Sequence, residues 1–128
     1  MKSEQAEMEH LTMQEEAAMR RIWHLGSATV KQLLEQYGSE ALPYTTLASI
    51  VKNLERKNFV KAEREGIGYR YRPLVTEEEY KRSSLGTMVS NYFAGSYRQV
   101  VNFFVENQQL SKEELQEIIG LIEDGGEG

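Results

Sequence analysis

Short polar and cationic side chains between residues 44 and 57 are spaced so that they would share one face of an α-helix. At about 100° per residue, the face opposite the apolar residues carries Thr45, Ser49, Lys52 and Arg56, with Thr46 and Asn53 on its flank. Hydroxyl and amide groups hydrogen-bond to base edges in the major groove of DNA, and a threonine methyl packs on a thymine methyl. We therefore predict base contacts from Thr45, Thr46, Ser49 and Asn53.

Lysine and arginine side chains in and around this segment would hold backbone phosphates, which position a protein on DNA without specifying sequence. Residues 40–74 contain seven lysines and arginines and four acidic residues, although the whole chain has a net charge of -5. The basic charge is therefore concentrated in one segment, as in proteins that bind nucleic acid. The predicted phosphate contacts are Lys31, Lys52, Arg56, Lys57, Arg64, Arg70 and Arg72.

Residues suited to catalysis or metal binding are sparse. The chain has no cysteine, which excludes thiolate metal sites and cysteine nucleophiles. His10 and His24 have no partner set for a catalytic triad or a metal centre, and the acids of Glu77–Glu79 suit the first turn of a helix. Gly66-Ile67-Gly68 predicts a turn, since no strand–loop–helix context for a phosphate-binding loop follows. We predict no enzyme, no cofactor and no catalytic or metal-binding residue.

Capping boxes, in which Ser or Thr is followed three residues later by Glu or Gln, mark the expected helix starts. They begin at Thr12, Thr29, Thr76, Ser96 and Ser111. Apolar residues at helical spacing predict a first helix over 13–25, a second over 30–37 and a third over about 43–58. Pro43 suits the first position of the third helix. The buried stripe of that helix is expected to hold Leu47, Ile50, Val51 and Leu54.

Beyond the third helix the apolar period changes to two residues. Residues 59–64 and 69–72 predict two strands joined by a turn over 65–68, and Pro73 ends the second strand. Three helices followed by a hairpin are typical of a winged helix, so we expect a mainly α (α+β winged helix) fold. A polar helix face alone is typical of an ordinary solvated surface. Its position before a basic hairpin favours DNA recognition.

The remainder of the chain predicts three more helices, over about 77–93, 97–106 and 112–123. Their apolar side chains either form one intramolecular core or pair with a second chain. We favour a homodimer, because these short helices carry more apolar surface than they can cover alone, and two copies would place two recognition helices one DNA turn apart. The predicted dimer interface comprises Leu85, Met88, Val89, Phe93, Val100, Val101, Phe104, Leu115, Ile118, Ile119 and Ile122.

The expected organisation has four parts. A flexible segment over 1–10 precedes a winged-helix DNA-binding domain over 11–74, a helical dimerisation domain over 75–124 and a flexible tail over 125–128. No apolar run approaches the ~20 residues that a membrane span needs, and the first ten residues are too polar and acidic for a secretory signal. These features predict a cytoplasmic protein without direct membrane insertion.

Three stretches of the chain carry a family resemblance. They read Leu11-Thr12, Glu15, Met19 and Ile22-Trp23 followed by Gly26; Tyr44-Thr45-Thr46-Leu47 with Leu54 and Lys57; and Gly68-Tyr69-Arg70-Tyr71-Arg72-Pro73. Together they resemble the first helix, recognition helix and wing of the penicillinase-repressor family, the BlaI/MecI repressors. The resemblance extends from about Leu11 to Ile122. It implies a homodimeric repressor that binds a pseudo-palindromic operator and silences antibiotic-resistance or related genes.

The same resemblance implies that repression is relieved by proteolysis, triggered by a membrane-bound sensor metalloprotease. The family's Asn-Phe cleavage site matches Asn102-Phe103, in the fifth expected helix. Aligning Asn107–Leu110 with the family without a gap places the site at Phe103-Phe104 instead. Cleavage there would separate the DNA-binding half from its dimer contacts and lower the affinity for DNA through lost avidity.

The chain departs from the family pattern at two points. The absence of cysteine excludes the thiolate copper sensing of some relatives, and Asn53 stands where many relatives have arginine, which changes the expected operator preference. Two other functions fit the same fold, because fold does not fix function. A winged-helix protein-interaction module would expose apolar residues on the third helix and hairpin. A small-molecule-responsive regulator would need a ligand pocket between the domains.

Overall fold

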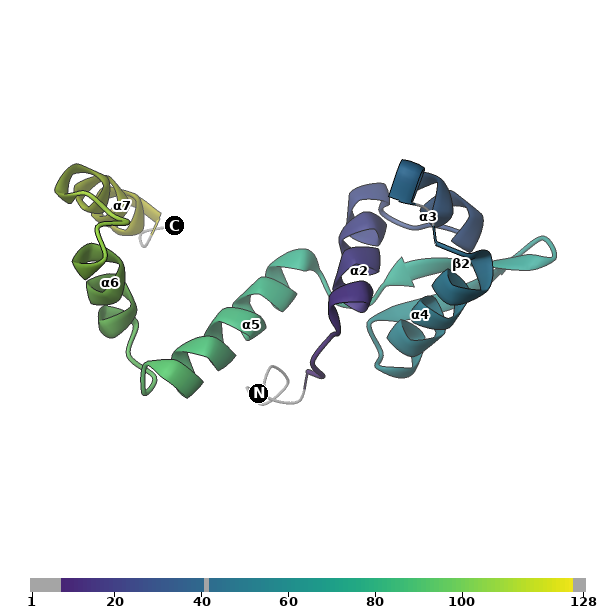
Figure 1. Cartoon of the computed structure of the whole chain (residues 1–128), viewed down its shortest axis with the longest axis horizontal. Coiled ribbons are helices and arrows are strands. Elements are labelled where there is room, and N and C mark those ends of the chain that lie inside the picture. The colour runs from purple at the N-terminus through teal and green to yellow at the C-terminus, as the bar shows by residue number, and fades with distance from the viewer. Residues whose placement is uncertain (1–7, 41, 126–128) are drawn as a thin grey trace. The chain divides into compact units, whose positions relative to one another are not determined.

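The computed structural model describes residues 8–40 and 42–125, and in the last helix the side chains of Ile119 and residues 121–125 lie outside the description (Figure 1). The elements are α2 (Met13–Leu25), α3 (Val30–Tyr37), the 3-10 helix η1 (Gly38–Glu40), α4 (Tyr44–Arg56), β1 (Val60–Glu65), β2 (Gly68–Pro73), α5 (Glu77–Tyr92), α6 (Tyr97–Glu106) and α7 (Lys112–Gly125). This order confirms the predicted mainly helical winged-helix fold.

Capping boxes begin four of these helices as predicted. At α2, the Thr12 hydroxyl accepts from the Glu15 N–H at 3.1 Å and the Glu15 carboxylate accepts from the Thr12 N–H at 2.9 Å. The same reciprocal bonds begin α3, α5 and α7. At α6, the Ser96 hydroxyl accepts from the Gln99 N–H. Each cap stabilises its helix by about 1 kcal/mol, because it satisfies a backbone N–H that has no partner within the helix.

The ends of α4 differ from the predicted 43–58. Pro43 is the N-cap rather than the first helical residue, since its ψ of 143° is extended, and the helix begins at Tyr44. At the other end, Asn58 adopts a left-handed φ of 66°. Asn58 therefore cannot continue the helix, and the Phe59 N–H returns to the Leu54 carbonyl at 2.9 Å.

The first compact unit contains the described residues up to Ser83, and its core lies between α2, α3, α4 and the hairpin (Figure 1). The predicted stripe of α4 is buried throughout. Each fully buried aliphatic or aromatic side chain stabilises the fold by about 2 kcal/mol. The largest of these are Phe59, Met19, Ile22, Leu33, Leu47, Leu54, Val51 and Val60.

The hairpin is held to the helices by its second strand. Tyr71 of β2 exchanges two backbone hydrogen bonds with Ala28, in the α2–α3 loop, at 2.8 and 3.0 Å. Its strands pair antiparallel with Glu63 opposite Arg70, which confirms the predicted hairpin. Gly66, at the tip, has a φ of 62°, a left-handed conformation that favours glycine.

The start of α5 belongs to the first unit. The Trp23 indole N–H donates to the Val75 carbonyl at 2.8 Å, and Tyr80 packs against the rings of Trp23 and Phe59. The Tyr80 hydroxyl also donates to Glu16 at 2.7 Å. Because these side chains complete the core, the compact unit extends past the predicted domain end at residue 74 to Ser83.

The expected flexible segment over 1–10 is held at its end. Met8 packs against the core, and the His10 carbonyl accepts a hydrogen bond from Lys57. Residues 1–7 of that segment, and residues 126–128 of the predicted tail, lie outside the described residues. Gly125, the first residue of the predicted tail, ends α7.

The second compact unit, from Ser84 onward, contains the rest of α5 together with α6 and α7. The Phe93 and Phe103 rings pack edge to face with centroids 5.8 Å apart, which joins the end of α5 to α6. Many other large apolar side chains in this unit are exposed in the single chain. Among the described residues, every helix is too short or too polar to cross a membrane.

Candidate nucleic-acid interface

The exposed face of α4 has the composition that the sequence predicted. Thr45, Ser49, Lys52, Asn53 and Arg56 are exposed and Thr46 is half-buried, opposite the buried stripe. The Arg56 guanidinium lies 3.5 Å from the Asn53 side-chain oxygen, so a cation and an amide adjoin near the end of the helix. The face therefore offers hydroxyls in its first turns and cations in its last turns, as base and phosphate contacts require.

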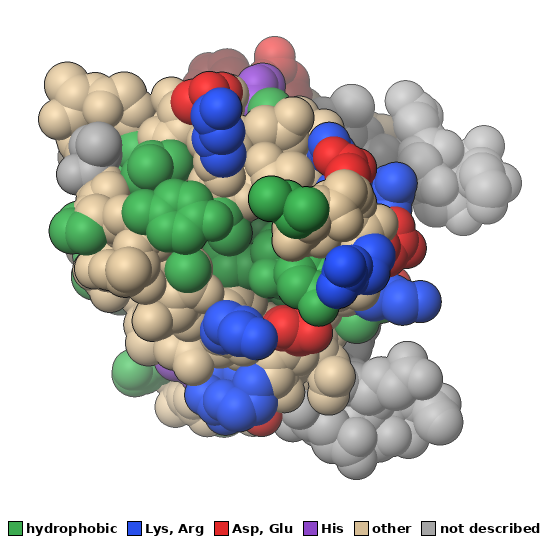
Figure 2. Space-filling model, turned by 90° about the vertical axis from the view of Figure 1, so that its right-hand side faces the viewer, with side chains coloured by type: hydrophobic (Ala, Val, Ile, Leu, Met, Phe, Trp, Pro, Cys, Tyr) green, Lys and Arg blue, Asp and Glu red, His purple; other side chains and the backbone are tan. Residues whose placement is uncertain are grey.

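An open pocket joins this helix to α3 and the hairpin. Two of the predicted phosphate contacts, Lys31 and Lys52, line it together with aromatic side chains. Its lining residues are Thr29, Val30, Lys31, Tyr44, Ala48, Lys52, Glu65, Gly68, Tyr69 and Tyr71. Figure 2 views the end of the first unit that carries α3, α4 and the hairpin, and shows lysine and arginine side chains around a central apolar area. The structure thus brings both lysines and the hairpin to one surface.

Lys57 is not on that surface. Its ammonium donates to Glu15 Oε1 at 2.7 Å and to the His10 carbonyl at 2.9 Å. The two side chains are only 12% and 5% exposed. Burial raises the pKa of Glu15. Hydrogen bonds from Lys57 and Thr12 and the charge of Lys57 together lower it by more, so the pKa lies below its ordinary value. The ion pair joins α2 to the end of α4, and we remove Lys57 from the proposed phosphate contacts.

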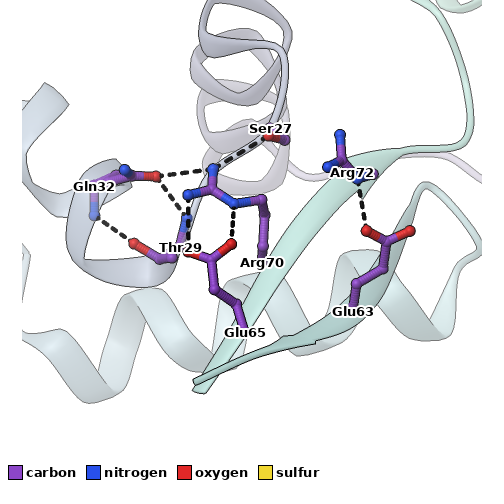
Figure 3. A network of polar contacts seen from close by, with 7 residues as sticks. All are labelled: Ser27, Thr29, Gln32, Glu63, Glu65, Arg70 and Arg72. Carbon is purple, nitrogen blue, oxygen red and sulfur yellow. Dashed lines mark hydrogen bonds and ion pairs between the residues drawn. The ribbon is translucent and has the colours of Figure 1, made fainter. Parts of the chain in front are cut away.

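The hairpin arginines differ from one another (Figure 3). Arg70 forms two hydrogen bonds with the Glu65 carboxylate and reaches Ser27 and Gln32 outside the hairpin. Arg72 donates to Glu63 at 2.6 Å, and its side chain is 53% exposed. Arg64 is exposed and lies over the Tyr69 ring, 5.6 Å from its centroid. Each is on the predicted hairpin, but Arg70 is largely engaged within the protein.

The Glu65–Arg70 ion pair stabilises the charged forms of both side chains. The hydrogen bond from Arg70 lowers the pKa of Glu65, and the charges of Arg70 and Arg72 lower it further. The same hydrogen bond raises the pKa of Arg70. Burial raises the pKa of Tyr71, which forms part of the pocket. Both shifts favour the charged forms of Glu65 and Arg70, so this pair stays charged at neutral pH.

The family model described as "Penicillinase repressor" matches residues 11–124, which is nearly the whole chain. The chain belongs to the penicillinase repressor family. The resemblance predicted from the sequence is thus confirmed. The family consists of transcriptional repressors and not of enzymes.

Individual relatives within the family are distant. The penicillinase repressor of Bacillus licheniformis is 23% identical over 107 residues, which cover 83% of this chain and 84% of the relative. The methicillin resistance regulatory protein MecI of Staphylococcus aureus (strain N315) is 24% identical over 106 residues, covering 81% and 85%. A solution structure of monomeric Bacillus licheniformis BlaI in complex with the blaP half-operator has a TM-score of 0.49 at 19% identity. It covers 57% of this chain and 90% of that chain.

The predicted dimer residues of this family member differ in exposure. Leu85, Met88, Val101, Phe104 and Ile118 are exposed in the single chain, and Phe93, Val100 and Leu115 are half-buried. Val89 is 1% exposed and is therefore already covered within its own chain. We remove it from the proposed interface. The side chains of Ile119 and Ile122 lie outside the described residues.

Several residues of this surface were not predicted from the sequence. Tyr44 and Tyr69 line the pocket and are about half exposed. Glu63 and Glu65 bind the hairpin arginines. These pairs could have been found from the sequence, because acidic residues recur at every second position of β1 and arginines at every second position of β2. Their pairing depends on the register, which the turn at Gly66 fixes.

Proposed function

We propose that this protein is a homodimeric transcriptional repressor that binds a pseudo-palindromic operator and blocks access to a promoter. In this proposal α4 enters the major groove, where Thr45, Thr46, Ser49 and Asn53 contact bases. The proposed phosphate contacts are Lys31, Lys52, Arg56, Arg64 and Arg72. Family membership supports the proposal, and the relatives that match this chain are named as penicillinase and methicillin-resistance regulators.

One observation carries the DNA-binding part of the proposal: the exposed face of α4 adjoins the pocket between α3 and the hairpin. Lys31 and Lys52 lie at this pocket, so cations from two helices flank the polar face. A protein-interaction module would instead expose apolar residues along α4 and the hairpin. The exposed side chains of α4 are polar or cationic except for Tyr44, whereas the hairpin exposes Ile67 and Tyr69 at and beside its turn. The discrimination therefore rests on α4.

The test is a binding titration with the chain's own upstream intergenic DNA, at several salt concentrations and with excess nonspecific competitor. We expect a discrete complex whose affinity falls steeply with salt, because each phosphate contact releases counterions. Arg56→Ala should weaken binding to every sequence and lower the salt slope by about 1.8, because one phosphate contact is lost from each subunit of the dimer. Ser49→Ala should chiefly relax the sequence preference. Arg56→Ala that altered sequence preference alone would contradict the phosphate role.

The homodimer in this proposal forms through the second unit. Support comes from apolar side chains that remain exposed in the single chain, including Leu85, Met88 and Phe104 at 44%, 41% and 37%. Exposed apolar patches mark interaction sites, and we propose that these side chains form one. Sedimentation equilibrium at micromolar concentration should give twice the mass of the chain, and a monomer at every concentration would contradict this part of the proposal.

Relief of repression is proposed to occur by proteolysis in α6, triggered by a membrane-bound sensor metalloprotease. Asn102 and Phe103 are exposed on this helix. Cleavage after Asn102 or after Phe103 would separate the proposed base contacts from the last turn of α6 and all of α7. Mass spectrometry of the fragment from induced cells would distinguish the two bonds. Unchanged cleavage of an Asn102→Ala/Phe103→Ala variant would rule out the Asn102-Phe103 assignment.

A further inference from the structure

We propose that Arg70 is a positioning residue for operator binding, and that it fixes the hairpin against the start of α3 rather than contacting DNA phosphate. Arg72, two residues along the same strand, is then the phosphate contact of β2. The inference rests on the proposed DNA-binding function, but the hairpin attachment itself can be measured without DNA.

The contacts of Arg70 join three parts of the first unit (Figure 3). Its Nε donates to Glu65 Oε1 at 2.7 Å and its Nη2 to Glu65 Oε2 at 2.9 Å. These two parallel bonds are the bidentate geometry that makes an arginine–carboxylate pair strong and directional. Its Nη1 then reaches Ser27 Oγ at 3.2 Å and Gln32 Oε1 at 3.3 Å. Arg70 therefore connects both hairpin strands to the α2–α3 loop and to α3.

The attachment point on α3 is itself rigid. Gln32 Oε1 also accepts from the Thr29 N–H at 3.0 Å, and the Gln32 N–H donates to the Thr29 hydroxyl at 3.1 Å. This capping box fixes the Gln32 side chain to the first turn of the helix. Arg70 thus contacts a side chain whose own position is set by the backbone of α3.

Arg72 provides an internal comparison. Residues 70 and 72 project from the same face of the hairpin, because side chains alternate along a strand. Each arginine pairs with a glutamate of β1. Arg72, however, donates to Glu63 from Nε alone, at 2.6 Å, and its side chain is 53% exposed against 22% for Arg70. A phosphate can approach Arg72 without breaking a bidentate pair or a contact between the hairpin and α3.

The position of the hairpin matters for DNA because Glu65, Gly68 and Tyr69 line the same open pocket as Lys31 and Lys52. If the hairpin swings away from α3, the spacing between the cations of the helices and those of the hairpin changes. Contacts to one DNA duplex then cannot all form together. Loss of the Arg70 attachment should therefore weaken operator binding without removing a phosphate contact.

The experiment, in the full-length chain, compares Arg70→Lys with the matched control Arg20→Lys, which changes an exposed arginine that also pairs with a glutamate but is not among the proposed DNA contacts. Lysine keeps the charge but cannot form the planar bidentate pair. We expect Arg70→Lys to weaken operator binding about fivefold, the scale of one lost hydrogen bond, with an unchanged salt slope. Arg20→Lys should stay within about twofold, whereas Arg72→Gln, which removes one proposed phosphate contact from each subunit, should lower the slope by about 1.8.

Amide hydrogen exchange in the absence of DNA supplies the second readout. Arg70→Lys should speed exchange in β1 and β2, and Arg20→Lys should not. Ser27→Ala removes one acceptor of Arg70 and leaves the Glu65 pair intact. It should weaken operator binding and speed exchange in the hairpin, each by less than Arg70→Lys does. It keeps the test available if Arg70→Lys does not fold.

The outcomes separate the two proposals. Wild-type affinity for Arg70→Lys, together with a lower salt slope for Arg70→Gln, would overturn the positioning role and make Arg70 a phosphate contact. Unchanged exchange in both Arg70→Lys and Ser27→Ala would also overturn it. Failure of the wild-type chain to bind any duplex would overturn the proposed function, while faster exchange in Arg70→Lys would still support the attachment of the hairpin.

Discussion

Replacing Lys57 with methionine is expected to destabilise the first unit without changing its DNA contacts. Methionine fills a similar volume but removes the ammonium that pairs with Glu15 at 2.7 Å. The Glu15 side chain is 5% exposed, so water cannot fully replace the lost partner. Removing one member of a buried ion pair leaves the other charge desolvated, which destabilises strongly.

The magnitude follows from what Glu15 keeps and what it loses. It keeps its bond from the Thr12 N–H and loses its bond from Lys57. We therefore take the lower end of the range for a broken buried pair, about 3 kcal/mol. For a unit of this size that corresponds to a fall in melting temperature of about 12 °C or more. The salt slope of operator binding, measured well below the melting temperature, should stay unchanged.

The pH dependence gives an independent check by scanning calorimetry. In the wild type the pKa of Glu15 lies below its ordinary value of 4.5. The stability from the pair is thus complete above that value and is lost as the pH falls through the folded pKa. In Lys57→Met, burial without the ammonium should raise the pKa of Glu15, so the carboxyl takes up a proton on mild acidification. The difference in free energy of unfolding between the wild type and Lys57→Met should therefore narrow as the pH falls from about 7 to about 4.

Two controls make the reasoning refutable. Glu15→Gln/Lys57→Met removes both charges, and its glutamine can still accept from the Thr12 N–H, so much of the lost stability should return. Lys52→Met removes an exposed lysine of the same helix and should leave the melting temperature within a few degrees. A Lys57→Met protein as stable as the wild type but with a salt slope lower by about 1.8 would show that Lys57 binds phosphate in both subunits.

Three further changes have definite expectations. Glu63→Gln removes a negative charge and frees Arg72, so operator affinity should rise about threefold by the strength of an exposed ion pair; fluorescence anisotropy would detect it, and weaker binding would contradict the assignment of Arg72. Tyr80→Phe loses the 2.7 Å hydrogen bond to Glu16 and should lower the free energy of unfolding, measured in urea, by about 1 kcal/mol. An unchanged free energy of unfolding would show that this bond does not stabilise the unit. Phe104→Asp, at an exposed apolar position of α6, should shift sedimentation toward monomer, and an intact dimer would place the interface elsewhere.

The helices and hairpin of this chain follow closely from local signals. Capping residues such as Thr12 and Thr29 fix where helices start, and the observed bonds begin the helices where predicted. The predicted ends of α4 were less accurate, because the extended Pro43 and the left-handed Asn58 depend on how the chain packs beyond the helix. The unit boundary at Ser83 depends on packing in the same way, since it reflects the burial of Tyr80 against the core.

The candidate interface was predictable where side chains point outward from a regular element, as on α4. It was not predictable where a charge finds a partner far along the chain. Lys57 and Glu15 are 42 residues apart and Arg70 and Ser27 are 43 apart, so no spacing rule connects them. A cation count therefore treats Lys57, Arg70 and Arg72 alike, whereas the fold gives them different surroundings.

Trp23 is the only tryptophan in the chain, and its indole hydrogen-bonds the Val75 carbonyl beside Tyr80. Its fluorescence emission therefore reports on the junction between α2 and the start of α5, within the first unit. Far-ultraviolet circular dichroism, by contrast, sums over the helices of both units. Non-coincident transitions from the two optical signals would mean that the units unfold separately, so that one free energy of unfolding cannot describe the whole chain.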